Sequence, residues 1–397
     1  MGLIVYLLDQ PLDSRNRKRF GIQSWLNKGW TVEVWDLTPW IYPGVWAAFT
    51  GTQSWRASSF PECITVVSKA ALLRLSQRRP ALYIDETGDS YPALYARLFL
   101  RRRGASRVVC NLGVLPGYSD AKNTLVAKLQ RAISKGPARM LNLIHRSLLR
   151  TLAARLCKPD VMVISGERSK PSVRHRAEII WTHNFDYDIY LSQKTLVDTP
   201  AEEGYAVFID QDYCFHSDFL GQGVLSFMTP EKYFPVLCAG LREIADALKV
   251  NVRIAAHPRS SYQQKTANPF GDFPVEYGRT ADLIRNCKVV VSHDSTAIQF
   301  AVLFGKPVIF VTTDQLIPEN EGKAINSIAA ELGKAAINLD GDLRDIDWLA
   351  ELRVDVEKYA AYRRNYIKRD ASPDIPLWDI VIGQLAKPLG SPRSVGT

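Results

Sequence analysis

The feature that most constrains this chain is an alternation of short apolar runs with longer amphipathic stretches. Short apolar runs bounded by turn residues are typical of buried parallel strands, and the amphipathic stretches between them are typical of helices. The alternation occurs twice, once on each side of the polar segment TLVDTPAEEG at residues 195–204. The sequence therefore predicts an α/β protein with two successive Rossmann-like domains, each built on a parallel sheet.

The same pattern gives the boundaries of the expected elements. In the first half, strands are expected at 3–8, 31–35, 81–84, 107–111, 161–165 and 179–182, and helices at 14–27 and 91–102. In the second half, strands are expected at 205–209, 252–256, 289–292 and 307–311, with helices at 230–248, 280–286 and 296–304 and a mainly helical stretch at 348–385. The expected organisation is a first domain at 1–194, a linker at 195–204, a second domain at 205–386 and a loose tail at 387–397.

Composition indicates the setting in which the protein works. The chain has 397 residues, 46% of them hydrophobic and 23% charged, and no apolar run is long enough to span a membrane. Its first residues read as a strand rather than a signal peptide. Six cysteines are scattered without a CxxC pair, which is typical of a reducing cytosol and argues against a structural metal site. We therefore expect a cytoplasmic protein that needs no metal and no bound cofactor.

Ligands of open parallel sheets bind beyond the carboxyl ends of the strands. The sharpest signal at such a position is His257-Pro258-Arg259, which follows the apolar run 252–256. Proline disfavours helix at the residue before it, so His257 would be presented at the strand end. An imidazole there can donate a proton to a departing phosphate. The alternative is a histidine that only caps a loop.

A second strand end carries the run Ser292-His293-Asp294-Ser295-Thr296, just before an expected helix. Hydroxyls and free N–H groups at a helix start can hold a phosphate. Plain capping of that helix by Ser295 or Asp294 is the alternative.

Two further strand ends carry carboxylates. Asp85 and Glu86, followed by Thr87 and Gly88, end a strand of the first half, and either acid could be the base that deprotonates an acceptor hydroxyl. A solvated turn is the alternative. Asp210 and Asp212 open the second half and could contact a substrate or supply a carboxylate nucleophile.

These motifs together resemble those of the bacterial sialyltransferases and polysialyltransferases, which are GT-B enzymes that use CMP-activated sugars. That family has an acidic motif ending in glycine, an HP motif and a Ser/Thr motif. The first is matched loosely, because Thr87 stands before Gly88, and His257-Pro258 matches the second. The second half also resembles bacterial Kdo transferases, and teichoic-acid glycerophosphotransferases share the HP and serine layout.

The resemblance implies a GT-B fold, with two sheets that face one cleft, and specific residue roles. Glu86 or Asp85 would be the base and His257 the acid or phosphate partner, while kinship with the Kdo transferases would favour Asp210 or Asp212 as a nucleophile. The implied donor-binding residues are Pro258, Arg259, Ser292, His293, Ser295 and Thr296. The implied reaction moves a sialic-acid-like or Kdo sugar from CMP to a glycan or glycolipid acceptor of the bacterial surface.

The net charge of +9 is concentrated in one stretch, since residues 121–159 contain many Lys and Arg but no Asp or Glu. Leucines and isoleucines alternate with these cations, as in amphipathic helices that lie on an anionic membrane. A helix packed on the sheet with a solvated basic face is the alternative. Because aromatic interleaving and DNA-binding motifs are absent from the sequence, we expect no nucleic-acid partner. The predicted location is therefore the inner leaflet, as a peripheral protein.

Two other functions remain compatible with the sequence. One is a different reaction on the same fold, by a glycerophosphotransferase or a UDP-sugar transferase. The other is a non-catalytic scaffold in polysaccharide assembly.

Overall fold

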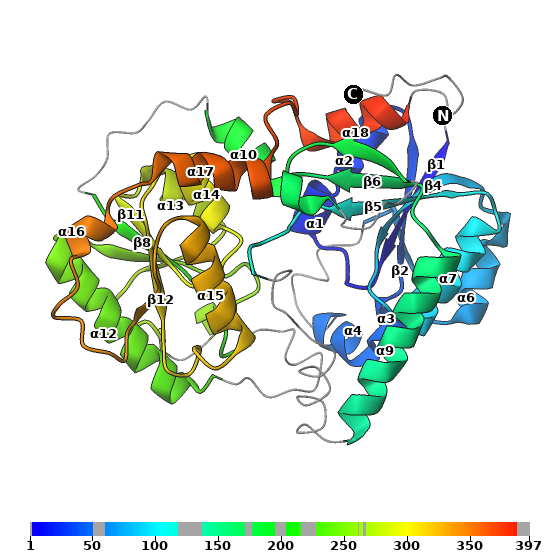
Figure 1. The fold of residues 1–397 in the computed structure, drawn as a ribbon. Helices are drawn as coiled ribbons and strands as arrows, with labels where there is room; N and C mark the ends of the chain where they lie inside the picture. Colours follow the sequence, from blue (N-terminus) through cyan, green and yellow to red (C-terminus); the bar gives the residue numbers. More distant parts are fainter. Residues whose placement is uncertain are drawn as a thin grey trace.

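The computed structural model describes residues 2–50, 60–117, 137–170, 177–194, 204–215, 228–260, 262–264 and 267–386. These residues form two α/β domains, which stand side by side in Figure 1. The expected linker lies outside the described residues except for Gly204, and the expected tail lies entirely outside them. Within the described residues, no helix is long and apolar enough to cross a membrane.

The first domain contains a parallel sheet of seven strands in the order β3-β2-β1-β4-β5-β6-β7. These strands are β1 (Leu3–Leu8), β2 (Thr31–Asp36), β3 (Cys63–Thr65), β4 (Pro80–Glu86), β5 (Ser106–Asn111), β6 (Val161–Ile164) and β7 (Glu178–Trp181). The helical segments are α1 (Ser14–Arg19), α2 (Ile22–Asn27), α3 (Thr38–Ile41), α4 (Pro43–Thr50), α6 (Lys69–Arg74), η1 (Leu75–Gln77), α7 (Tyr91–Arg101), α9 (Pro137–Leu156), η2 (Glu167–Ser169) and α10 (Phe185–Lys194).

The second domain contains a parallel sheet of six strands in the order β10-β9-β8-β11-β12-β13. These strands are β8 (Ala206–Ile209), β9 (Val252–Ala255), β10 (Val275–Glu276), β11 (Val289–Ser292), β12 (Val308–Thr312) and β13 (Ile337–Asn338). The helical segments are α12 (Pro230–Leu248), η3 (Tyr262–Gln264), α13 (Thr280–Asn286), α14 (Ile298–Leu303), α15 (Asn320–Glu331), α16 (Trp348–Glu351), α17 (Val356–Tyr362), the π-helical turn η4 (Arg363–Ile367) and α18 (Leu377–Leu385).

Burial explains why the strands could be recognised from the sequence. Every residue of β6, β8, β11 and β12 is buried, as expected for parallel strands covered by helices on both faces. The prediction of two Rossmann-like domains is therefore confirmed. The short edge strands β3, β10 and β13 were not predicted, because two or three residues leave no readable apolar run.

The helix expected at 14–27 is broken into α1 and α2 at Phe20 and Gly21. Gly21 has a left-handed φ of 60°, and a Cβ at this position would collide with the Trp378 ring. Trp378 also donates a 2.7 Å hydrogen bond from Nε1 to the Arg19 carbonyl oxygen. A helix from the other end of the chain therefore fixes this turn.

The chain passes between the domains in two places. Helix α10, expected in the first domain, packs against α13 and α14 of the second domain. Helix α18, expected in the second domain, packs against α2 and joins the apolar core of the first domain, where Figure 1 shows it in red near β1. The two passages touch where the Asn184 N–H donates to the Ile367 carbonyl oxygen over 3.0 Å.

Candidate functional site

Each sheet has one point where the strand order reverses, between β1 and β4 in the first domain and between β8 and β11 in the second. Ligands of such folds bind beyond the carboxyl ends of the strands at this point. The carboxylates and hydroxyls predicted from the sequence lie at the ends of β4 and β11 or just after β8 and β11, and the His-Pro turn lies just after β9. The candidate side chains are therefore found at the carboxyl ends of strands in both sheets.

The structure separates Asp85 from Glu86, which point to opposite faces of β4. Asp85 is buried and accepts a 2.7 Å hydrogen bond from Arg97 Nε and another of 2.7 Å from Arg107 Nε. The Thr87 hydroxyl donates to its other oxygen over 2.6 Å. Burial alone would raise the pKa of Asp85, but the two arginines outweigh it and hold the pKa below its usual value. The role of Asp85 as a base stays a prediction, and both of its oxygens already accept hydrogen bonds in this network.

Glu86 is partly exposed and lies on the other face of the sheet. Burial, and then the neighbouring charge of Asp85, raises its pKa to about 7, although the positive charge of Arg19 lowers it. A general base works best when its pKa lies near the working pH. Of the two acids that end β4, Glu86 is the one suited to proton transfer.

Asp210 organises the loops of the second domain. It is 2% exposed and accepts hydrogen bonds from the Asp212 N–H at 2.9 Å, the His257 N–H at 3.1 Å and the Tyr262 hydroxyl at 2.9 Å. Burial raises the pKa of Asp210. Asp212 is equally buried and has a left-handed φ of 53°. The role of either acid as a nucleophile stays a prediction, and both side chains are enclosed within the protein.

His257 begins a turn in which the Ser260 N–H donates to the His257 carbonyl oxygen over 2.9 Å. Its Nδ1 accepts the Arg259 backbone N–H at 3.3 Å, which leaves Nε2 to carry the proton of the neutral ring. The Arg259 side chain reaches the first domain and donates from Nη2 to Gln10 Oε1 over 2.9 Å. This contact joins the turn after β9 to the loop after β1.

The residues at the end of β11 and just after it differ in accessibility. Ser292 and His293 are both fully buried, and His293 contacts the Val311 carbonyl oxygen at 2.7 Å and the Tyr233 hydroxyl at 3.0 Å. Burial lowers the pKa of His293 to about 4, so the ring is neutral. Donor binding by these two side chains stays a prediction, and neither side chain is exposed.

Ser295 and Thr296 lie just before α14. Ser295 is buried and its hydroxyl accepts the Ala297 N–H over 3.2 Å just before α14 begins, while Thr296 is exposed. Asp294 accepts the Tyr213 hydroxyl, and burial raises the pKa of Asp294 to about 6. Thr296 therefore offers the accessible hydroxyl of this loop.

Sequence reasoning missed the loop after β1 and the helix that follows it. Asp9 accepts the Gly88 N–H over 2.8 Å, and burial raises its pKa. Gln10 holds Arg259, and Arg19 lies at the end of α1 with its guanidinium 4.2 Å from the centre of the Phe185 ring. The signal was available, since this loop also follows a strand that ends at the reversal point.

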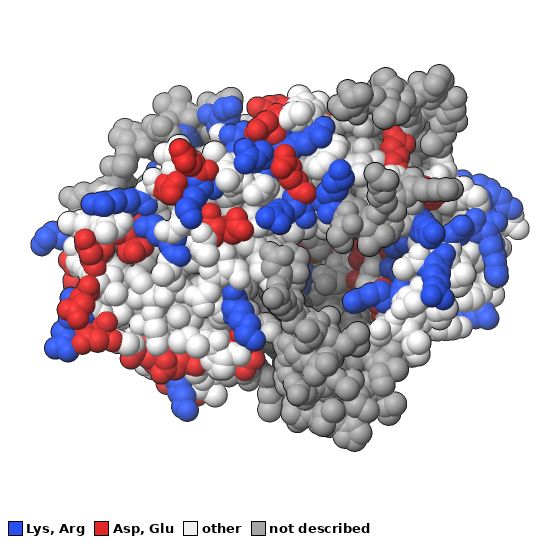
Figure 2. Space-filling model, viewed as in Figure 1, with Lys and Arg blue, Asp and Glu red and all other residues white. Residues whose placement is uncertain are grey.

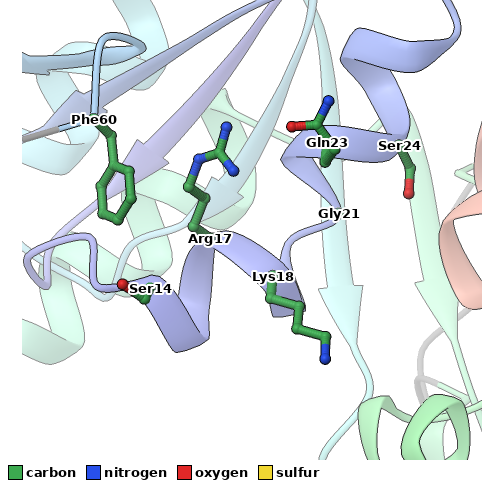
Figure 3. A pocket seen from close by; sticks show the side chains of 7 residues that line it. All are labelled: Ser14, Arg17, Lys18, Gly21, Gln23, Ser24 and Phe60. Carbon is green, nitrogen blue, oxygen red and sulfur yellow. The ribbon is translucent and has the colours of Figure 1, made fainter. Parts of the chain in front are cut away.

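A surface pocket of about 380 Å³ lies beside α1 and α2. Figure 3 shows its lining: Ser14, Arg17, Lys18, Gly21, Gln23, Ser24 and Phe60. Arg17 forms an ion pair with Glu62 here and lies over the Phe60 ring. None of the residues predicted from the sequence lines this pocket. Within the described residues, no cluster of three His, Cys, Asp or Glu side chains could hold a metal ion.

Comparison with solved structures gives matches at low identity. The glycosyltransferase VinC in complex with dTDP is 14% identical, with 97% of this chain and 98% of VinC covered and a TM-score of 0.51. The spinosyn forosaminyltransferase SpnP is 15% identical over 98% of both chains, with a TM-score of 0.49. A putative UDP-N-acetylglucosamine 2-epimerase from Listeria monocytogenes is 13% identical over 100% of this chain and 99% of the other, also at 0.49.

The match to VinC confirms the predicted GT-B fold. No protein-family model and no curated protein sequence matches the chain. The expectation of a CMP-sugar donor therefore stays a prediction, as does the expectation of no metal.

Proposed function

We propose that this protein is a glycosyltransferase that moves an acidic sugar, sialic-acid-like or Kdo, from a CMP-activated donor to a bacterial surface polysaccharide or lipid-linked glycan. One observation carries the proposal. The Arg259–Gln10 contact brings the His-Pro turn of the second domain to the strand ends of the first, where Glu86 lies. The view in Figure 2 shows the surface hollowed between the two domains.

The chemistry needs a base on one side of the transferred sugar and an acid on the other. Glu86 accepts the proton of the acceptor hydroxyl, whose oxygen attacks the anomeric carbon of the donor. The bond from that carbon to the phosphate oxygen breaks, and its electron pair leaves with CMP. His257 donates the Nε2 proton to the departing phosphate oxygen. Each side chain belongs to the domain that would hold its own substrate.

The second domain offers further groups to the donor. Arg259, two residues after His257, supplies positive charge for the phosphate from its exposed side chain, and the exposed Thr296 hydroxyl supplies a hydrogen bond. A CMP donor carries a single phosphate, so this modest set of groups suits it without a metal clamp.

Nucleotide release from a panel of donors tests the proposal. Purified protein is incubated with CMP-N-acetylneuraminate, CMP-Kdo, UDP-N-acetylglucosamine, dTDP-glucose and CDP-glycerol, and the free nucleotide is measured. Slow hydrolysis of one CMP-sugar that is lost in His257→Gln is the expected result. Turnover of UDP- or dTDP-sugars alone would keep the enzyme and reject the acidic donor. Turnover of CDP-glycerol would indicate a glycerophosphotransferase, and no release from any donor would favour the scaffold.

Helix α9 supports the membrane part of the proposal. Leu149 and Ala153 are buried against the α7 side, but Leu148, Leu152 and Leu156 are 59%, 45% and 47% exposed. Residues four apart share one face of a helix, so these three leucines form an apolar stripe on the surface. In Figure 1 the helix projects past the edge of the first domain. Residues 121–136 of the basic segment lie outside the described residues.

Flotation with lipid vesicles tests this surface. We expect the protein to float with vesicles that contain anionic phosphatidylglycerol, and less with pure phosphatidylcholine, since basic residues contribute about 1 kcal/mol each near an anionic surface. The variant Leu148→Ser/Leu152→Ser should lose flotation while its melting temperature is unchanged. Equal flotation of the variant and the wild type would contradict a role for this stripe.

A further inference from the structure

Arg19, at the end of α1, is a partly buried cation whose side chain makes no hydrogen bond or ion pair to any residue that the structure describes. Its Nε is buried without an acceptor, and its guanidinium lies 4.2 Å from the centre of the Phe185 ring. Its neighbour Arg17 contrasts with it, because Arg17 pairs with Glu62. An arginine has five N–H donors, and a partly buried one is normally paired.

The backbone around Arg19 holds it firmly in this place. The Arg19 carbonyl oxygen accepts the Trp378 indole N–H over 2.7 Å, and Gly21 brings α2 under the same ring. Phe185 comes from the first residue of α10, at the passage between the domains. Two segments from distant parts of the sequence therefore fix the position of a cation that has no hydrogen-bond or ion-pair partner among the described residues.

The charged groups around Arg19 belong to the proposed site. Arg15 and Arg259 are the cations close enough to influence its charge, and Glu86 and Asp186 are the acids. Burial lowers the pKa of Arg19, and burial raises the pKa of both Glu86 and Asp186. Neither acid pairs with Arg19. The guanidinium thus lies near the candidate base and near the turn that carries His257.

We propose that Arg19, supported by Arg15 and Arg259, binds an anionic group of the substrate, a carboxylate or a phosphate, next to Glu86. This inference rests on the proposed function and names a residue that would recognise the acidic part of its substrate. The planar guanidinium offers two parallel N–H donors to such an anion, and the Phe185 ring fixes its plane. An anion here would satisfy N–H donors for which the described part of the chain offers no acceptor.

Calorimetric titration at low salt tests the proposal without requiring turnover. The probes are N-acetylneuraminate, its neutral counterpart N-acetylmannosamine, and inorganic phosphate. We expect the wild type to bind at least one anion and not the neutral sugar, and Arg19→Gln to weaken that binding on the order of tenfold or more. If Arg19→Gln weakens the binding of N-acetylneuraminate alone, the site binds a carboxylate. If it weakens the binding of phosphate alone, the site binds a phosphate.

The matched control is Lys18→Gln, which removes an exposed cation of the same helix that lines the surface pocket. It should bind the anions within twofold of the wild type. If Arg19→Gln melts too low to be titrated, Arg19→Lys decides, because it keeps the charge and loses the planar pair of donors, and it should bind severalfold more weakly. Binding unchanged in the Arg19 variants, or no anion binding by the wild type, would overturn the proposal. Anion binding without release of any nucleotide would reject only the transferase function.

Discussion

A buried aspartate holds a strand-end loop in both domains, but the charges around the two aspartates differ. In each, a buried aspartate accepts a backbone N–H two residues on, from Thr87 to Asp85 at 3.1 Å and from Asp212 to Asp210 at 2.9 Å. In the first domain two arginines surround the aspartate, whereas in the second only neutral donors do. Burial raises the pKa of both aspartates. The two arginines lower the pKa of Asp85 below its ordinary value, whereas the pKa of Asp210 stays raised.

The difference shows how buried acids and reactive groups are distributed in this fold. Each aspartate holds a loop in shape next to a partly exposed residue: Glu86 follows Asp85, and Asp210 accepts the backbone N–H of His257. Asp85 and Asp210 therefore hold the loops in place. Glu86 and His257, which lie next to them, are the candidates for the chemistry.

The largest expected effect is on turnover. Replacing His257 with Gln should lower the rate of nucleotide release by a factor of about 10²–10⁴, the usual contribution of a general acid, because glutamine cannot transfer a proton. The melting temperature should stay near that of the wild type, since the Asp210 contact is to the His257 backbone. Steady-state kinetics and calorimetry on the same preparations measure both quantities. Equal turnover of the two proteins would remove His257 from the reaction.

Asp85→Asn should cost about 3–5 kcal/mol of unfolding free energy, because it leaves two arginines near a buried neutral amide. Urea unfolding measures this change. A loss below about 1 kcal/mol would mean that the arginines are solvated in the variant and that the ion network contributes little.

His293 should make the protein acid-sensitive. Its folded pKa of about 4 lies below the ordinary value of 6.5, so the unfolded chain takes up a proton that the folded chain does not. The stability is complete above about pH 6.5 and should fall by about 3 kcal/mol as the pH drops to about 4. His293→Gln should be less stable at neutral pH and lack this component. The unfolding free energies of both proteins are measured with urea across this pH range. The same pH dependence in the wild type and the variant would contradict a buried neutral His293.

Asp210→Asn should have the smallest effect, a loss of about 1–2 kcal/mol at neutral pH, because neutral donors surround the side chain. The pH dependence gives a sharper contrast. Because the pKa of Asp210 is raised in the folded protein, its contribution to stability is complete below the ordinary pKa of an aspartate and is lost as the pH rises through the folded-state pKa. The pKa of Asp85 is lowered, so its contribution to stability is instead lost as the pH falls. Unfolding free energies of Asp210→Asn across pH 4–8 should therefore fall less steeply with rising pH than those of the wild type.

The sequence was sufficient for the sheets, because buried parallel strands such as β8 and β11 are continuous apolar runs. It could not show that α10 and α18 pack on the opposite domains, since an amphipathic face does not say which partner covers it. The motifs pointed to loops at the strand ends but did not show which side chains there are accessible. Whether Asp85 or Glu86 is free depends on Arg97 and Arg107, which pair with Asp85 from α7 and β5. Arg19 escaped notice because nothing in the sequence distinguishes an unpaired arginine from Arg17, its paired neighbour.

The pH dependence of nucleotide release tests the central claim, that Glu86 is the base of a transfer reaction between the domains. The pKa of Glu86, raised to about 7 by burial, predicts a rate that increases with pH through about 7 as the carboxyl loses its proton. Glu86→Gln should release nucleotide slowly and without this rise, while it stays folded. A rise that persists unchanged in Glu86→Gln, or a wild-type rate that is flat between pH 6 and 8, would contradict the account.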